Sequence, residues 1–176
     1  MRVQVVLLCE DQAHETFVRR FLRKRGFKPG EIRTLPFPDG SQSGEQWVRS
    51  RYPDELKAIR SRRSAYLLVV TDADQHTTAL RKSALDQECD RRGVDRRTAD
   101  EPVLVIVPRR NIETWCEYVD GRVVDETTNY PKRFVAKQHR ELADALYRMC
   151  HEQQRLVEPV PRSLAESCDE YAKLKR

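Results

Sequence analysis

Several features that would place a protein in a familiar class are missing from this sequence of 176 residues. No apolar run approaches the ~20 residues of a membrane span, so we expect no membrane partner. The opening MRVQVVLLCEDQ has one positive side chain and an apolar run interrupted by Gln4, which favours a buried strand over a signal peptide. The five cysteines include no C-x-x-C pair, and their odd number predicts neither a disulfide framework nor a structural zinc site. Together these absences predict a cytoplasmic protein.

Glycine is also scarce, and two of the six glycines fall in the stretch PDGSQSGEQ, residues 38–46. The stretch lacks the Lys-Ser/Thr pair of a P-loop, so the sequence does not support ATP hydrolysis. Gly40 and Gly44, with Ser41 and Ser43 beside them, could present backbone N–H groups to a phosphate. A turn followed by a helix cap is the other interpretation, and both stay open.

Basic residues are the first feature that is abundant. The sequence has 33 Lys and Arg against 28 Asp and Glu, for a net charge of +5, and 25 of the 33 are arginine. Arginine presents a planar fork that binds phosphate through two hydrogen bonds, whereas lysine is a flexible point charge. The excess therefore indicates a nucleic-acid partner, DNA or RNA, although G/C-rich coding would raise the arginine content equally well.

Four short runs rich in Val, Ile and Leu predict strands that are covered on both faces, as in a parallel sheet. They span residues 3–9, 32–35, 66–71 and 103–107, and the second is a candidate edge strand. Helical patterns lie between them. We expect Pro53 to break one of these helices in two, and Leu80 and Cys89 to lie on the apolar face of another. The sequence thus predicts an α/β fold with a mostly parallel four-stranded sheet flanked by helices. Residues 1–120 form the core in this prediction, and residues 121–176 form a helical C-terminal extension packed on it.

Acidic residues follow two of these strands directly. Glu10 and Asp11 come after the first strand, and Asp72 and Asp74 come after the third. Ligands bind at the carboxyl edge of a parallel sheet, so the two groups would converge if their strands are neighbours. Converging carboxylates repel by about 4 kcal/mol per close pair at intermediate dielectric, and Mg²⁺ is the usual ion that offsets this repulsion. The alternative is that Asp72 and Asp74 only cap the following helix.

The segments LLCEDQAHE and LLVVTDADQHT resemble the two signature segments of the Toprim (topoisomerase–primase) fold, a Rossmann-like fold, over roughly residues 3–115. This resemblance implies that Glu10 acts as acid/base or metal ligand and that Asp72 and Asp74 hold Mg²⁺, or Mn²⁺ in its place. Asp11 stands where most Toprim proteins have glycine, which makes it an additional candidate ligand. Glu15 is similar in position to a further acid of the two-metal members, or is a solvated helix residue.

The segment VPRRNIETWCEYVDG makes the sequence similar to small bacterial Toprim-like proteins related to nucleases of the overcoming-lysogenization-defect type. That resemblance implies a role in phage defence. The segment follows the fourth strand, so Arg109 and Arg110 are candidate phosphate contacts and Glu113 is a candidate metal ligand. His76 is a further candidate for contact with phosphate or water. We expect Trp115 in the core and Glu117 in solvent.

The leading hypothesis is a Mg²⁺-dependent nuclease, or a related phosphodiester-transfer enzyme, that acts on DNA or RNA. The second is a non-catalytic Toprim-like module that binds nucleic acid or belongs to a larger complex, for example with an ATPase subunit. A phosphatase of the haloacid-dehalogenase type is a weaker third, because DADQHT only loosely matches DxDxT and lies on the wrong strand.

Overall fold

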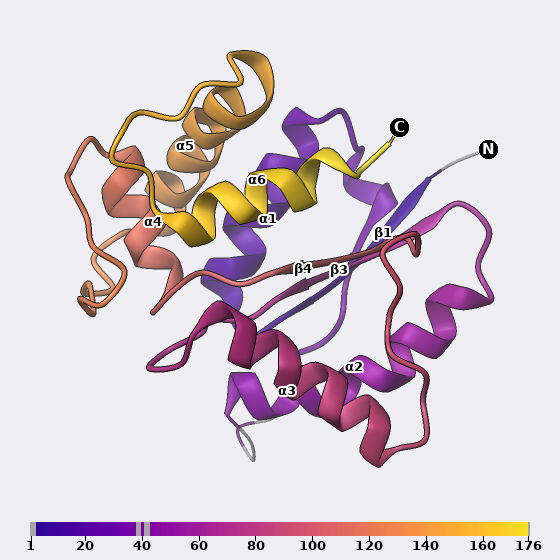
Figure 1. Ribbon diagram of the computed structural model, residues 1–176. Coiled ribbons are helices and arrows are strands. Elements are labelled where there is room, and N and C mark those ends of the chain that lie inside the picture. Colours follow the sequence, from indigo (N-terminus) through magenta and orange to yellow (C-terminus); the bar gives the residue numbers. More distant parts are fainter. Residues whose placement is uncertain (1–2, 38–39, 41–42, 176) are drawn as a thin grey trace.

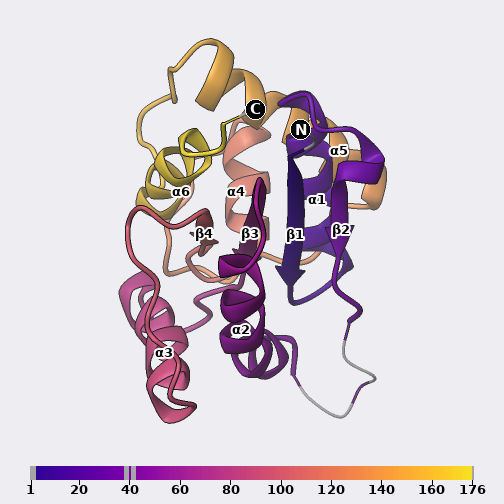
Figure 2. The same cartoon turned by 90° about the vertical axis from the view of Figure 1, so that its right-hand side faces the viewer.

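The computed structural model describes residues 3–37, 40 and 43–175. Its centre is a sheet of four parallel strands in the order β2-β1-β3-β4, seen side by side in Figure 2. The strands are β1 (Gln4–Cys9), β2 (Ile32–Thr34), β3 (Ala65–Val70) and β4 (Val103–Ile106). The predicted α/β fold is therefore confirmed, with the short β2 at an edge of the sheet.

Helices cover both faces of the sheet, which explains why β1, β3 and β4 are almost entirely apolar (Figure 1). One face carries α1 (Gln12–Lys24), α4 (Ile112–Val119), α5 (Ala136–Tyr147) and α6 (Arg162–Ala172). The other carries α2 (Gly44–Arg60) and α3 (Thr78–Arg91). Two single turns, η1 (Pro29–Glu31) and η2 (Arg148–Glu152), complete the elements. No helix in the described part of the chain is both long and apolar enough to cross a membrane.

The start and end of α1 follow from local chemistry. The Asp11 carboxylate accepts a hydrogen bond of 2.9 Å from the backbone N–H of His14 and so caps the helix. Gly26 ends it with a φ of 92°, a left-handed conformation that glycine adopts without steric cost. Between these points α1 buries one face in the core. Only Glu10 separates its cap residue from the end of β1.

Two details of the predicted helices are wrong. Pro53 does not break α2, which runs through it as one helix because Val48, Tyr52 and Leu56 bury a continuous apolar face around the proline. This burial offsets the ~3 kcal/mol that an internal proline costs. Leu80, which the sequence pattern places on the apolar face of α3, is 58% exposed.

The C-terminal helices share one hydrophobic core with α1. The ring of Phe21 on α1 lies 5.7 Å from that of Tyr147 on α5 and 4.3 Å from that of Tyr171 on α6, measured between ring centroids. All three side chains are at most 9% exposed. Residues beyond 120 are thus part of the packing on this face of the sheet (Figure 1).

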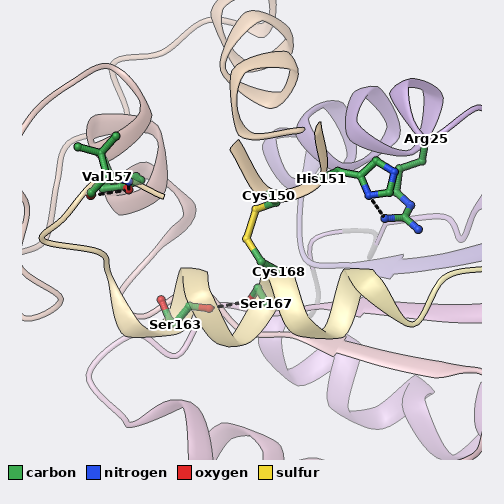
Figure 3. The surroundings of a disulfide bond; sticks show 8 residues. Arg25, Cys150, His151, Val157, Ser163, Ser167 and Cys168 are labelled. Atoms are coloured by element: carbon green, nitrogen blue, oxygen red, sulfur yellow. Dashed lines mark hydrogen bonds between the residues drawn. A yellow bond between two sulfur atoms is a disulfide. The ribbon is translucent and has the colours of Figure 1, made fainter. Parts of the chain in front are cut away.

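A disulfide joins Cys150 of η2 to Cys168 of α6 (Figure 3), a pairing that the odd number of cysteines does not predict. Residues 153–161 reverse the chain direction and bring the two sulfurs together, an effect that counting cysteines does not detect. Cys9, Cys89 and Cys116 are buried free thiols, as the apolar pattern around them predicts.

Glu117 is buried, although the sequence predicts it in solvent. It is 1% exposed instead of solvated, and its two oxygens accept hydrogen bonds of 2.6 and 2.7 Å from the guanidinium of Arg133. Arg122 approaches the same carboxylate at 3.2 Å. The pair therefore ties the 120–135 segment to α4.

We expect Glu117→Gln to lower the free energy of unfolding by about 1–3 kcal/mol, because it removes a buried, charge-assisted pair of hydrogen bonds. Urea denaturation measures the change. The matched control is Glu141→Gln, whose carboxylate is 62% exposed and 3.8 Å from Lys137, and which should change stability by less than about 0.5 kcal/mol. Equal effects of the two substitutions would contradict the structural role of Glu117.

Candidate functional site

Two acidic segments meet where β1 and β3 end. Cys9 and Val70 are register partners in the sheet, so Glu10 and Thr71 leave it side by side. The Glu10 carboxylate accepts hydrogen bonds from the Thr71 hydroxyl and, at 2.9 Å, from the backbone N–H of Asp72. The convergence that neighbouring strands would produce is therefore present in the structure.

The segment after β4 is joined to the segment after β3 by backbone hydrogen bonds. The N–H groups of Ala73 and Asp74 donate to the carbonyls of Pro108 and Arg110, at 2.8 and 3.0 Å. Asp74 and Arg110 both have left-handed backbones, with φ of 53° and 67°. Non-glycine residues in this conformation cost of order 1–3 kcal/mol and cluster at functional sites. These two hydrogen bonds hold the segment after β4, which contains Arg109 and Arg110, against Asp72 and Asp74.

The carboxylates at this edge act on one another electrostatically. Burial raises the pKa of Glu10, and the charge of Asp72 raises it further, to about 7. The same two causes, in the same order of size, raise the pKa of Asp74 and of Glu113. The charge of Asp72 therefore contributes to the raised pKa of all three of these carboxyl groups.

His14, which the sequence does not single out as a site residue, lies at the centre of this cluster. It is fully buried on the inner face of α1, and its Nε2 is 3.0 Å from Oδ1 of Asp72. Burial lowers its pKa, but Asp72 and Asp11 outweigh this effect and raise the pKa to about 10, so the ring is an imidazolium that donates to Asp72. The available signal was its position three residues after the helix cap, which turns it inward.

Asp11 and Lys132 form the outer side of the cluster. Burial raises the pKa of Asp11, but the charge of His14 and the ammonium of Lys132, 3.3 Å away, lower it below its usual value. The Lys132 side chain comes from the segment between α4 and α5 and is 69% exposed. Its pKa is lowered by burial but raised more strongly by Asp11 and Glu113, so it is an accessible cation at the rim. Only the fold brings it here.

Glu113 is the most enclosed of the acids. It sits in the first turn of α4 and is 2% exposed, and its Oε2 is buried with no hydrogen-bond partner among the described residues. A buried, unpaired carboxylate oxygen is costly, which makes it notable in a folded protein. The sequence prediction placed Glu113 at this edge, and the structure does the same.

The remaining predicted site residues divide between three places. Asp74 is 59% exposed and pairs with Arg81 at 3.1 Å, and together with His76 and Arg110 these residues line a pocket beside the cluster. Glu15 points toward β2, where it accepts a hydrogen bond of 2.7 Å from Thr34. Gln75 and Asn129 also line the pocket, whereas Arg109 does not; the backbone N–H of Arg109 donates to the Ser163 hydroxyl at 3.1 Å.

The helix-capping alternative for Asp72 and Asp74 is wrong. The cap of α3 is Thr77, whose hydroxyl accepts a hydrogen bond of 3.1 Å from the backbone N–H of Leu80. Neither aspartate is needed to begin the helix: Asp72 contacts His14 on α1, and Asp74 pairs with Arg81 of α3.

The donor set suits a hard divalent cation in part. Glu10, Asp72 and Glu113 offer carboxylate oxygens, the ligands that Mg²⁺ prefers, and Oε2 of Glu113 is without a partner in the described chain. However, residues 3–37, 40 and 43–175 contain no group of three or more His, Cys, Asp or Glu side chains already arranged around a common metal position. The cluster thus has the chemistry for the ion but not a closed set of ligands.

The glycine-containing stretch before α2 lies partly outside the described residues, which do not include Ser41. Ser43 caps α2 and Gln46 completes the capping box, so the cap interpretation holds for its described end. Gly44 touches the site directly, because a Cβ built there would lie 2.7 Å from Cβ and 2.9 Å from the carbonyl oxygen of Glu10.

Comparisons of the chain with protein-family models, with curated proteins and with solved structures gave no match.

We expect Gly44→Ala to destabilise the protein by about 1–3 kcal/mol, since the added methyl group meets the Glu10 backbone. Helix propensity alone would favour alanine by about 1 kcal/mol, so the sign of the change is informative. Gly30→Ala is the control: a Cβ there has no atom within 4 Å, and the substitution should be neutral or stabilise by up to about 1 kcal/mol. Denaturant unfolding of both variants decides the matter, and a stabilising Gly44→Ala would show that the close approach is absent.

Proposed function

We propose that this protein is a Mg²⁺-dependent enzyme that hydrolyses phosphodiester bonds in DNA or RNA. The observation that carries the proposal is the meeting of Glu10 and Asp72 where β1 and β3 end, with the backbone N–H of Asp72 donating to the Glu10 carboxylate at 2.9 Å; the charge of Asp72 also contributes to the raised pKa of Glu10, Asp74 and Glu113. Such an arrangement is unfavourable by itself and is favoured by a bound cation. Perturbed carboxyl groups gathered at one edge are also typical of functional sites.

In this proposal Asp72, Glu10 and Glu113 would hold the ion, with Asp74 and Asp11 as the nearest further acids. Bound Mg²⁺ supplies a polarised water and positive charge for the leaving oxygen. The resemblance of the segments around Glu10 and Asp72 to the Toprim signature supports these two residues in the site, and it implies Asp74 as the further metal ligand. A role in phage defence and an ATPase partner are implied only by that resemblance and stay predictions.

Residues of the chain itself orient these acids. His14 donates to Asp72, and the hydroxyl of Thr71 and the N–H of Asp72 hold one oxygen of Glu10, so both carboxylates have fixed directions. Lys132 places an accessible positive charge beside Asp11, where it can contact a phosphate oxygen of the substrate. His14 and Lys132 are positioning and binding groups in this scheme.

We expect Asp72→Asn and Glu10→Gln each to lower Mg²⁺-dependent cleavage of plasmid DNA or of RNA by at least about a hundredfold, because both substitutions keep shape and remove charge. Gel assays with excess Mg²⁺ and with EDTA measure the loss. Asp54→Asn is the control, since this carboxylate of α2 is 43% exposed and pairs with Arg92 away from the cluster. Its activity should equal that of the unsubstituted protein.

Calorimetric titration with Mg²⁺ and Mn²⁺ tests the metal separately from catalysis. The unsubstituted protein should bind at millimolar concentration or below, and Asp72→Asn should not. If there is no binding, or if activity is unchanged in both site variants, the proposal is wrong and the non-catalytic hypothesis takes its place.

A further inference from the structure

Several arginines on the protein surface do not offer free charge to a polyanion. They already pair with acids, which lowers their attraction for phosphate. The pairs are Arg20–Asp144, Arg60–Glu101, Arg91–Glu88, Arg92–Asp54, Arg96–Asp90 and Arg97–Glu170. The excess of arginine in the composition is therefore a poor guide to where nucleic acid would bind.

Arg110 differs from these arginines. It has no carboxylate within 4.0 Å in the part of the chain that the structure describes, and its Nη1 reaches only the backbone carbonyl of Asp74, at 3.4 Å. Its Nε is buried without a hydrogen-bond partner among the same residues. The nearby Asp74 carboxylate is already paired with Arg81. Among the described residues, Arg110 thus has a positive charge that pairs with no carboxylate and a buried donor that makes no hydrogen bond.

The Arg110 side chain lines a polar pocket of about 370 Å³. Arg81 lines the same pocket and is 7% exposed; its charge is balanced by Glu45 at 2.7 Å and Asp74 at 3.1 Å, so it forms a fixed wall of the pocket. Asn129 closes another side, held in place by the Asn111 amide, which donates to its Oδ1 at 3.1 Å. A pocket of this size accommodates a nucleotide-sized ligand, and its walls are polar.

The pocket also has a fixed relation to the acidic cluster. Asp74 lines it and lies two residues after Asp72, and the backbone hydrogen bond from Asp74 to Arg110 sets the distance between the two walls. A strand whose phosphodiester lies at Asp72 would therefore place a neighbouring phosphate near Arg110.

We propose that this pocket binds a phosphate group of a nucleic-acid strand, with Arg110 as the principal contact. The choice of nucleic acid as the source of the phosphate rests on the proposed function. The anion-binding chemistry rests on the pocket alone: the guanidinium of Arg110, which pairs with no carboxylate among the described residues, lines a polar cavity and matches the acceptor oxygens of phosphate.

The test measures binding without catalysis. Fluorescence anisotropy of a short labelled single-stranded oligonucleotide, as DNA and as RNA, is recorded in EDTA at several salt concentrations. Arg110→Gln should weaken binding about tenfold or more, because it removes charge-assisted hydrogen bonds, and should lower the slope of log K against log salt by about one. Arg155→Gln is the matched control: this exposed arginine lies outside the pocket, and its loss should change neither quantity.

Asn129→Asp provides a second variant that keeps the acceptor for Asn111 but adds negative charge to the pocket wall, and it should also weaken binding. Inorganic phosphate should compete with the oligonucleotide on the unsubstituted protein and less so on Arg110→Gln. Equal affinities of Arg110→Gln, Asn129→Asp and Arg155→Gln, with the fold checked by circular dichroism, would overturn the proposal. Cleavage that persists alongside equal affinities rejects the pocket alone, whereas weakened binding without any cleavage rejects only the proposed hydrolysis.

Discussion

Repulsion between carboxylates at the carboxyl edge of the sheet is the interaction around which the rest of the structure is arranged. Glu10, Asp74 and Glu113 each respond to the charge of Asp72, and burial strengthens the effect because it removes the water that would screen them. The protein counters it with the imidazolium of His14 within the cluster. Gathering like charges in this way has a free-energy cost, which a bound cation would relieve.

The parallel sheet makes this gathering unavoidable. In-register pairing of β1 with β3 and of β3 with β4 makes the three following segments leave the sheet at one edge. Helices on one face then shield the cluster from solvent, because α1 buries His14 and α4 buries Glu113. The 120–135 segment completes the arrangement by bringing Lys132 to the rim, anchored through Arg133 and Glu117.

Sequence patterns predicted the elements better than their surroundings. Apolar runs located all four strands, because a strand covered on both faces must be apolar at every position. The same reasoning failed for Pro53, where tertiary burial outweighs a local preference, and for Glu117, where a buried ion pair replaces the expected solvent contact. Counting cysteines failed for Cys150 and Cys168, since their meeting depends on a reversal of the chain.

The sequence by itself determined the α/β class and the positions of Glu10 and Asp72 after their strands, because side-chain periodicity and strand ends are local properties of the chain. Only the tertiary structure decided which charged groups are paired and which are not. It placed His14 against Asp72, turned Glu15 toward Thr34, and left Arg110 facing a pocket. The physical reason is that pairing of charges depends on distances between elements far apart in the chain, and packing of the helices on the sheet sets those distances.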